Sequence, residues 1–274
     1  MYKQKEGMAM PTTYTHDYFG KKVYQKLPEE MKRVIRENGE LYRIGLHGPD
    51  ILFYYMVSKN PITQFGVNMH KEKGRAFFEQ GMETVRRTGD KALLSYLLGF
   101  GCHYLLDSYC HPYVDEMADA GVISHTLLEK EYDRFLMEES GKNPYIYRPS
   151  DCIVPRYQWA KEIHKVLPTV KTVNIYISMR MMKVLTNLMV CNDGEKRRKR
   201  IQKLFKLTGS ESAMSLLEHF MKKEPIPGSS IPVARLNTLF WEAVEEVPEE
   251  LMELYSLSKE KKKLSDRWDR TYNG

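Results

Sequence analysis

The stretch FGCHYLLDSYCHPYVDE, residues 100–116, places three polar side chains in an otherwise apolar run. His103, Asp107 and His111 follow at steps of four residues, which on an α-helix puts them on one stripe at intervals of about 6 Å. A core helix with local hydrogen bonds would explain one buried histidine. It explains all three poorly, because a buried carboxylate without a partner is very costly. A bound metal would give every member of the stripe a partner.

The spacing indicates more than one metal ion. His103 and His111 lie about 12 Å apart along the helix axis, too far for both to reach one ion comfortably. His125 and Glu129 are again four residues apart, after a turn near Gly121. If their helix packs antiparallel to the first, they return alongside His111. We therefore expect a site of His111, His125 and Glu129 with a fourth position open to water or substrate, as in catalytic zinc sites.

The other site, around His103 and Asp107, needs ligands from upstream, and the candidates are His16, His47, Asp50 and His70. Asp50 lies in LHGPDILF, where Gly48-Pro49 favours a turn that aims the carboxylate from the start of a helix. Nitrogen and oxygen ligands without thiolate suit Zn²⁺ and leave Mn²⁺ and Fe²⁺ as alternatives.

Apolar residues recur with the helical period almost throughout, and alternating strand patterns are nearly absent. This periodicity predicts an all-α fold. Asp90 can cap the long helix that follows it, and Ser124 can cap the helix that carries His125. Residues 143–156 and 223–232 are expected to be loops.

The histidines are distributed unevenly. Most of them lie between residues 16 and 125, so we expect the metal ligands in the N-terminal half and His164 and His219 outside the metal site. The length of 274 residues fits one large domain or two small ones. We expect a single all-helical domain over residues 1–274, with the metal ligands in about 11–140 and supporting helices in about 155–260.

Composition adds weaker constraints. The net charge of +6, from 42 Lys and Arg against 36 Asp and Glu, favours mild attraction to anionic surfaces or substrates and does not imply nucleic acid. The four cysteines are irregularly spaced and form no Cys-x-x-Cys pair, so neither a disulfide framework nor a thiolate zinc site is expected.

The start of the chain, MYKQKEGMAMPTTYTHDYFG, lacks the apolar stretch of an export signal, so we expect a cytoplasmic protein. The most apolar segment, residues 92–110, is nearly long enough to cross a membrane. Because His103 and Asp107 interrupt it and the run breaks at His111-Pro112, a buried core helix is expected instead.

Four segments together resemble the zinc-dependent phospholipase C family, which is related in fold to the zinc-dependent single-strand nucleases. They are THDYF, GPDILF, GFGCHYLLDSYCHP and SHTLLEKEYD, with His70 about 20 residues after GPDILF. The resemblance covers roughly residues 11 to 140. It implies a multi-helical phospholipase C-like fold, a cluster of zinc ions and cleavage of phospholipid headgroups.

The resemblance also implies how three ions would share the ligands. One ion would be held by Asp50, His70, His103 and Asp107. A second would be held by His111, His125 and Glu129. The third would be held in part by His16 and Asp107, so that Asp107 bridges two ions. Asp50 would also act as the general base, a role that its position close to the metal favours as well.

The third site departs from the family pattern. In secreted members the mature amino-terminal residue, a tryptophan, completes it with its amino nitrogen and carbonyl oxygen, and no tryptophan lies near the start of this chain. Two protein ligands are usually too few to hold zinc tightly. We expect two well-occupied ions, with the third site empty, weakly filled or completed by another residue, for which His47 is the first candidate.

The expected function is metal-dependent hydrolysis of a phosphoester, because clustered zinc ions neutralise the phosphate and lower the pKa of bound water. Two alternatives stay open: a nuclease-type phosphodiesterase, and a non-catalytic binding protein that the metal only stabilises. A nuclease is expected to have aromatic side chains near the cluster on which bases can stack, and the sequence gives no clear sign of them.

The basic run EKRRKRIQKLFK, residues 195–206, keeps Ile201, Leu204 and Phe205 on one helix face. It is interpreted either as a solvated helix or as a peripheral contact to an anionic membrane. The sequence does not define the oligomeric state.

Overall fold

The computed structural model describes residues 12–55, 60–190, 195–208 and 220–274. Within these ranges the chain forms helices and no strand, and the helices pack around one hydrophobic core. The predicted all-α, single-domain fold is therefore confirmed. The division into a ligand-bearing part and a supporting part stays a prediction.

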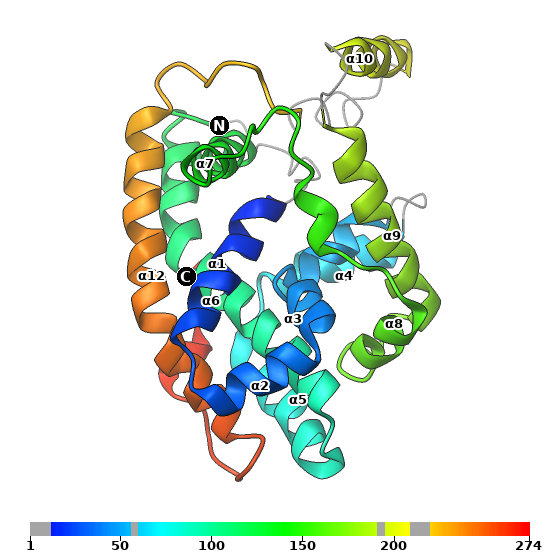
Figure 1. Ribbon diagram of the computed structural model, residues 1–274, viewed down its shortest axis with the longest axis vertical. Helices are drawn as coiled ribbons and strands as arrows, with labels where there is room; N and C mark the ends of the chain where they lie inside the picture. The colour runs from blue at the N-terminus through cyan, green and yellow to red at the C-terminus, as the bar shows by residue number, and fades with distance from the viewer. Residues whose placement is uncertain (1–11, 56–59, 191–194, 209–219) are drawn as a thin grey trace.

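Figure 1 shows the elements in chain order by colour. The first part of the chain contains α1 (Thr13–Lys26), α2 (Glu29–Glu37), α3 (Gly39–Gly45), the 3-10 helix η1 (Gly48–Tyr54), α4 (Pro61–Met69), α5 (Gly74–Thr88) and α6 (Lys91–Asp119). The remainder contains α7 (His125–Glu139), η2 (Pro149–Cys152), α8 (Tyr157–His164), α9 (Thr172–Leu188), α10 (Lys196–Thr208), α12 (Ser230–Ser256) and η4 (Asp266–Asp269).

Helix α6 is the centre of the molecule. It is 29 residues long, and every residue from Leu93 to Ser108 is buried. A helix that is buried on all sides is stable only when other elements cover it completely. In Figure 1, α6 passes through the middle, with α12 along one side and α8 and α9 on the other. The polar stripe on α6 is thereby placed deep inside the fold.

Helix α6 begins where the sequence predicts it but extends further than the apolar run. The side chain of Asp90 accepts a hydrogen bond from a backbone N–H of the first turn, as expected of a cap. The helix then continues through Pro112 to Asp119. Proline removes one backbone hydrogen bond, but Val114 is fully buried and anchors the turns beyond it. As a result the polar stripe has one more step, at Asp115.

The connections differ in detail from the sequence-based expectation. Residues 143–156 include the short helix η2, and α12 already begins inside the predicted 223–232 loop. Ser124 precedes α7 as expected, but its hydroxyl makes no capping hydrogen bond. In the part of the chain that the structure describes, no helix has the length and apolar character needed to cross a membrane.

Two glycines bring α3 and α6 into backbone contact. A Cβ atom added to Gly99 would lie 2.1 Å from the carbonyl oxygen of Tyr42, and one added to Gly45 would lie 2.3 Å from the carbonyl oxygen of Tyr96. A backbone oxygen cannot turn away as the end of a side chain can. This contact holds the end of α3, and therefore the start of η1, against α6.

We expect Gly99→Ala to destabilise the fold by about 3 kcal/mol or more, the upper end of the usual cost of overpacking, because only backbone movement can relieve the clash. Gly39→Ala is the matched control, since nothing lies within 4 Å of a Cβ atom added there. It should change the free energy of unfolding by less than about 1 kcal/mol. Urea denaturation of both variants measures the difference, and equal losses would contradict the backbone contact.

Candidate metal centre

The predicted ligands come from distant parts of the sequence and meet beside α6. Helix α1 supplies His16, η1 supplies Asp50, and His70 follows α4 directly. Helices α6 and α7 supply the others. Their donor atoms form three groups, each within 4.8 Å: His16, Asp50 and His103; His70, His103 and Asp107; and His111, His125 and Glu129.

Asp107 lies between the groups. Its Oδ2 is 3.1 Å from His103 Nε2. Its Oδ1 is 3.5 Å from His16 Nε2 and 3.7 Å from His111 Nε2. The two oxygens of one carboxylate therefore face different histidines, as expected of a carboxylate that bridges two ions. The bridging role stays a prediction, which this geometry favours.

His111, His125 and Glu129 form the outer group. The two imidazole rings are 5.0 Å apart between centroids, and each Nε2 lies 3.3 Å from Oε1 of Glu129. Ligand atoms bound to one tetrahedral zinc at about 2.0–2.1 Å lie about 3.3 Å from one another, so these spacings fit a single ion. The predicted return of His125 alongside His111 is confirmed.

Asp50 faces two histidines of the inner part of the cluster. Its Oδ1 is 2.9 Å from His70 Nε2, and its Oδ2 is 3.8 Å from His103 Nε2. The Gly48-Pro49 turn starts the helix that carries it, as predicted, although η1 is a 3-10 helix. Gly48 has a φ of +45°, and a Cβ atom there would lie 2.2 Å from Cδ2 of His103. Only glycine therefore fits between η1 and His103.

A carboxylate that the sequence analysis missed holds His16 in place. Asp133 of α7 accepts hydrogen bonds from the backbone N–H groups of Tyr14 at 3.3 Å and Thr15 at 2.8 Å, and from the Thr15 hydroxyl at 2.6 Å. It thus caps the first turn of α1 from outside the helix. Asp133 lies four residues after Glu129 and therefore on the same face of α7. This spacing could have identified Asp133 from the sequence.

Oxygen acceptors orient two of the ligand rings. Nδ1 of His125 lies 2.9 Å from Oδ1 of Asp115, and Nδ1 of His70 lies 2.9 Å from the carbonyl oxygen of Gly66. An acceptor at Nδ1 keeps the proton there and leaves Nε2 free to bind metal. Asp115 was missed although it continues the four-residue stripe of α6, because the apolar run breaks at Pro112 and the helix does not.

The two other histidines among the described residues, His47 and His164, belong to none of the three groups. The ring of His47 is 6.4 Å from that of His16, and its Nε2 is 3.4 Å from Sγ of Cys152. Its role as a further ligand stays a prediction. His164 contacts a backbone carbonyl oxygen through Nδ1 at 2.9 Å and belongs to none of the groups. His219 lies outside the described residues.

Burial keeps the imidazoles of His16 and His103 neutral, whereas the contact with Asp50 raises the pKa of His70. Burial lowers the pKa of His16 to about 3 and that of His103 well below its ordinary value, with neighbouring histidines adding to both shifts. Burial also raises the pKa of Asp107 to about 7. Neutral imidazoles have the lone pairs that a metal needs, and a cation here would favour the charged form of the carboxylate.

Charge pairs dominate the outer group. Burial opposes the charged form of His111, but Asp107 and Glu129 outweigh it and raise the pKa to about 9. Burial is likewise outweighed at His125, where Glu129 and Asp115 raise the pKa to about 10. Glu129 is buried too, yet the two histidines hold its pKa well below the ordinary value. Protons here occupy the nitrogens that would bind metal, so metal binding should weaken as the pH falls.

Unpaired atoms indicate that protein groups alone do not complete the cluster. Among the described residues, both ring nitrogens of His103 and Nδ1 of His16 are buried without a hydrogen-bond partner. His103 Nε2 is close to Asp107 but out of line for a hydrogen bond. Each such atom costs about 1–3 kcal/mol. The set of nitrogen and oxygen donors therefore fits a metal ion, and its chemistry suits zinc.

The fold and the cluster define a helical protein with a buried group of histidines and carboxylates that could hold metal. Residues 15–180, more than half of the chain, match the family described as zinc dependent phospholipase C. The chain belongs to this family, as the resemblance of its four segments indicates. All the predicted ligands lie within the matched residues. No curated protein and no solved structure matched the chain.

We expect Asp107→Ala to lose more zinc than Glu129→Ala. Loss of Glu129 removes one ligand of the outer group, and about one ion per chain should be lost. Loss of Asp107 removes a ligand that faces His16, His103 and His111, so more than one ion should be lost. Elemental analysis of protein purified without chelator gives the count, with circular dichroism as the check on folding. Equal losses would mean that Asp107 bridges nothing.

Proposed function

We propose that this protein is a zinc-dependent hydrolase of phosphoesters, with a phospholipase C-like phosphodiester as its substrate. The observation that carries the proposal is the joining of the three ligand groups. His103 belongs to two of them, and Asp107 lies within 3.7 Å of a histidine of the third. Ions held so close together can act on one phosphate, which supports hydrolysis over a purely structural role.

A cavity beside the cluster supports access for a substrate. Its wall includes His16, Asp107, His111 and Glu129. The side chain of His125, on the outer side of the cluster, is 32% exposed, whereas that of His103 is fully buried. A metal that only stabilised the fold would need no such opening, so the non-catalytic alternative is disfavoured.

The apolar part of the same wall favours a phospholipid over a nucleic acid. It includes Leu106, Val114 and Leu236. These side chains can cover the apolar part of a lipid while its phosphate faces the cluster. The aromatic residue in this wall, Tyr132, already stacks on Phe135, with the ring centroids 6.1 Å apart. This is a weak platform for the bases that a nuclease would bind.

The protein groups divide the work of hydrolysis. Zinc, when bound, neutralises the phosphate and lowers the pKa of water. The histidines would hold the zinc ions through Nε2 and set the distances between them. Asp50 accepts the proton from the attacking water, because burial raises the pKa of its carboxyl above the ordinary value and makes it a better base near neutral pH. Its Oδ1 also contacts His70, which fixes the direction of the carboxylate.

We expect Asp50→Asn to reduce turnover by about 100-fold or more, in the range of lost general bases, while zinc content falls much less. The carboxamide oxygen can still act as a weak ligand but cannot take up the proton. The measurements are turnover on a phosphodiester and zinc per chain for the same preparation. Full activity of the variant would refute the assignment of Asp50 as the base.

The substrate class is tested by comparing three compounds with the zinc-loaded protein. These are phosphatidylcholine, single-stranded DNA and a phosphomonoester. Release of the phosphorylated headgroup from the lipid is expected to be fastest. Faster cleavage of DNA would favour the nuclease, and no hydrolysis of any phosphoester by the fully loaded protein would favour the non-catalytic alternative.

We also propose that α10 contacts anionic membranes. In Figure 1 this basic helix lies at the edge of the molecule. Leu204 and Leu207 on it are 59% and 77% exposed, next to Lys203 and Lys206, which are exposed as well. Exposed apolar side chains beside lysines are typical of a helix that lies on a membrane surface. The side chain of Phe205 lies outside the described residues.

The double variant Lys203→Glu, Lys206→Glu reverses the charge of both side chains. It is expected to bind vesicles containing phosphatidylserine about 10-fold more weakly, or worse, than the wild type. The double variant Lys261→Glu, Lys263→Glu is the matched control, because it changes the net charge by the same amount at exposed positions that are distant from α10 in the sequence. Cosedimentation with vesicles measures binding. Equal weakening by both pairs would reduce the contact to net charge alone.

A further inference from the structure

Residues 264–274 pack against the metal centre from far along the sequence. Trp268 and Tyr272 of this segment are buried in the core. The Tyr272 ring lies 4.8 Å from the ring of His70 and 5.8 Å from that of His103. These residues fall outside the part of the chain that matches the family. The segment therefore forms one wall of the cluster that the family comparison does not cover.

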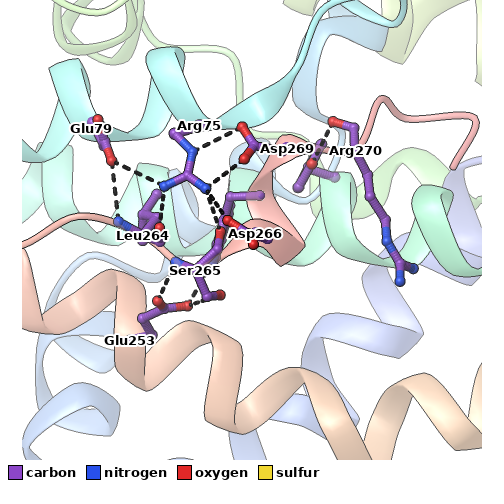
Figure 2. Close-up of polar contacts among 10 residues, drawn as sticks. Arg75, Glu79, Glu253, Leu264, Ser265, Asp266, Asp269 and Arg270 are labelled. Atoms are coloured by element: carbon purple, nitrogen blue, oxygen red, sulfur yellow. Dashed lines mark hydrogen bonds and ion pairs between the residues drawn. The ribbon is translucent and has the colours of Figure 1, made fainter.

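Arg75 of α5 anchors this segment. Figure 2 shows its guanidinium reaching Asp269, with Nε 2.9 Å from Oδ1 and Nη2 2.6 Å from Oδ2. The same side chain also donates to the backbone carbonyl oxygens of Leu264 and Ser265. A bidentate pair of this kind fixes direction as well as distance. The segment is thus held against α5 before it reaches the metal centre.

Two further contacts guide the segment onto the cluster. The Tyr104 hydroxyl, from α6, donates to the carbonyl oxygen of Arg270 at 2.7 Å. The backbone N–H of Tyr272 donates to the carbonyl oxygen of His70 at 3.3 Å. Since His70 is itself a predicted ligand, the backbone of the segment is tied directly to the metal centre. The next residue, Asn273, is placed beside the outer group.

We propose that Asn273 is a positioning residue for the outer metal group and acts through His111. Its Oδ1 lies 3.3 Å from His111 Nδ1. A carbonyl oxygen can only accept, so one ring proton is held on Nδ1, and Nε2 is the nitrogen that can give up its proton to bind metal. That Nε2 is the atom that faces Glu129 and Asp107.

The same arrangement recurs at two other ligand histidines, but not at His16 and His103, whose Nδ1 atoms lack a hydrogen-bond partner. His70 has the carbonyl oxygen of Gly66 at its Nδ1, and His125 has Asp115. In all three histidines, an oxygen at Nδ1 leaves Nε2 directed at the cluster. Loss of such an acceptor typically costs 10- to 100-fold in metal affinity. Because Asn273 is exposed and water can partly replace it, we expect the lower end of this range.

The test compares Asn273→Leu, which keeps the shape but removes the acceptor, with Asn273→Asp, which keeps an acceptor oxygen. Zinc affinity is measured by competition with a chromophoric chelator. Asn273→Leu should bind the outer zinc about 10-fold more weakly than the wild type. Asn273→Asp should bind it at least as tightly as the wild type. This readout concerns the zinc site alone, so it does not depend on which phosphoester is cleaved.

Thermal denaturation of the zinc-free proteins separates positioning from a general effect on folding. Zinc-free Asn273→Leu should unfold at the wild-type temperature, since an exposed side chain contributes little to the core. Two results would overturn the proposal: wild-type zinc affinity in Asn273→Leu, or equal losses of affinity in the two variants.

Discussion

The buried carboxylate of Asp107 is the constraint on which the rest of the structure depends. It lies in the middle of the most buried helix, within 3.7 Å of Nε2 of His16, His103 and His111. A charge at such a depth is tolerated only when it is compensated. The neutral imidazoles of His16 and His103 and the charged one of His111 do not compensate it fully, since burial still raises the pKa of the carboxyl to about 7. A divalent cation would, which makes the surrounding helices a support for a metal centre.

The supporting helices act through a few close contacts. The glycine contact between α3 and α6 sets where η1 begins, and Gly48 then lets η1 approach His103 without a side chain in between. Helix α7 contributes in two ways, because it carries outer ligands and because Asp133 caps the helix that bears His16. Each ligand is thus held by an element that also packs into the core, and a cavity opens beside the cluster.

The two parts of the cluster differ electrostatically for a physical reason. His16 and His103 are buried without a carboxylate strong enough to offset desolvation, so burial keeps them uncharged, whereas Asp50 raises the pKa of His70. The outer histidines lie nearer the surface and beside carboxylates, so they hold protons until metal displaces them. Metal binding by the outer histidines should therefore depend on pH more strongly than metal binding by His16 and His103. Two members of the outer group, His111 and Glu129, line the cavity beside His16 and Asp107, where an exchangeable position is useful to a hydrolase.

The sequence by itself determined the all-α fold, the stripe on α6 and the shared face of His125 and Glu129, because helical spacing fixes which side chains share a face. The approach of this pair to His111 also required α7 to pack beside α6. The sequence did not reveal Asp115, since the helix continues through Pro112 to turns that are held by the one buried side chain of Val114. It also did not reveal Asp133 as a cap or Asn273 as a neighbour of His111. Those contacts join residues that are more than 100 positions apart. Local periodicity carries no information about such distances, so only the packing of α1, α7 and the 264–274 segment around α6 decided them.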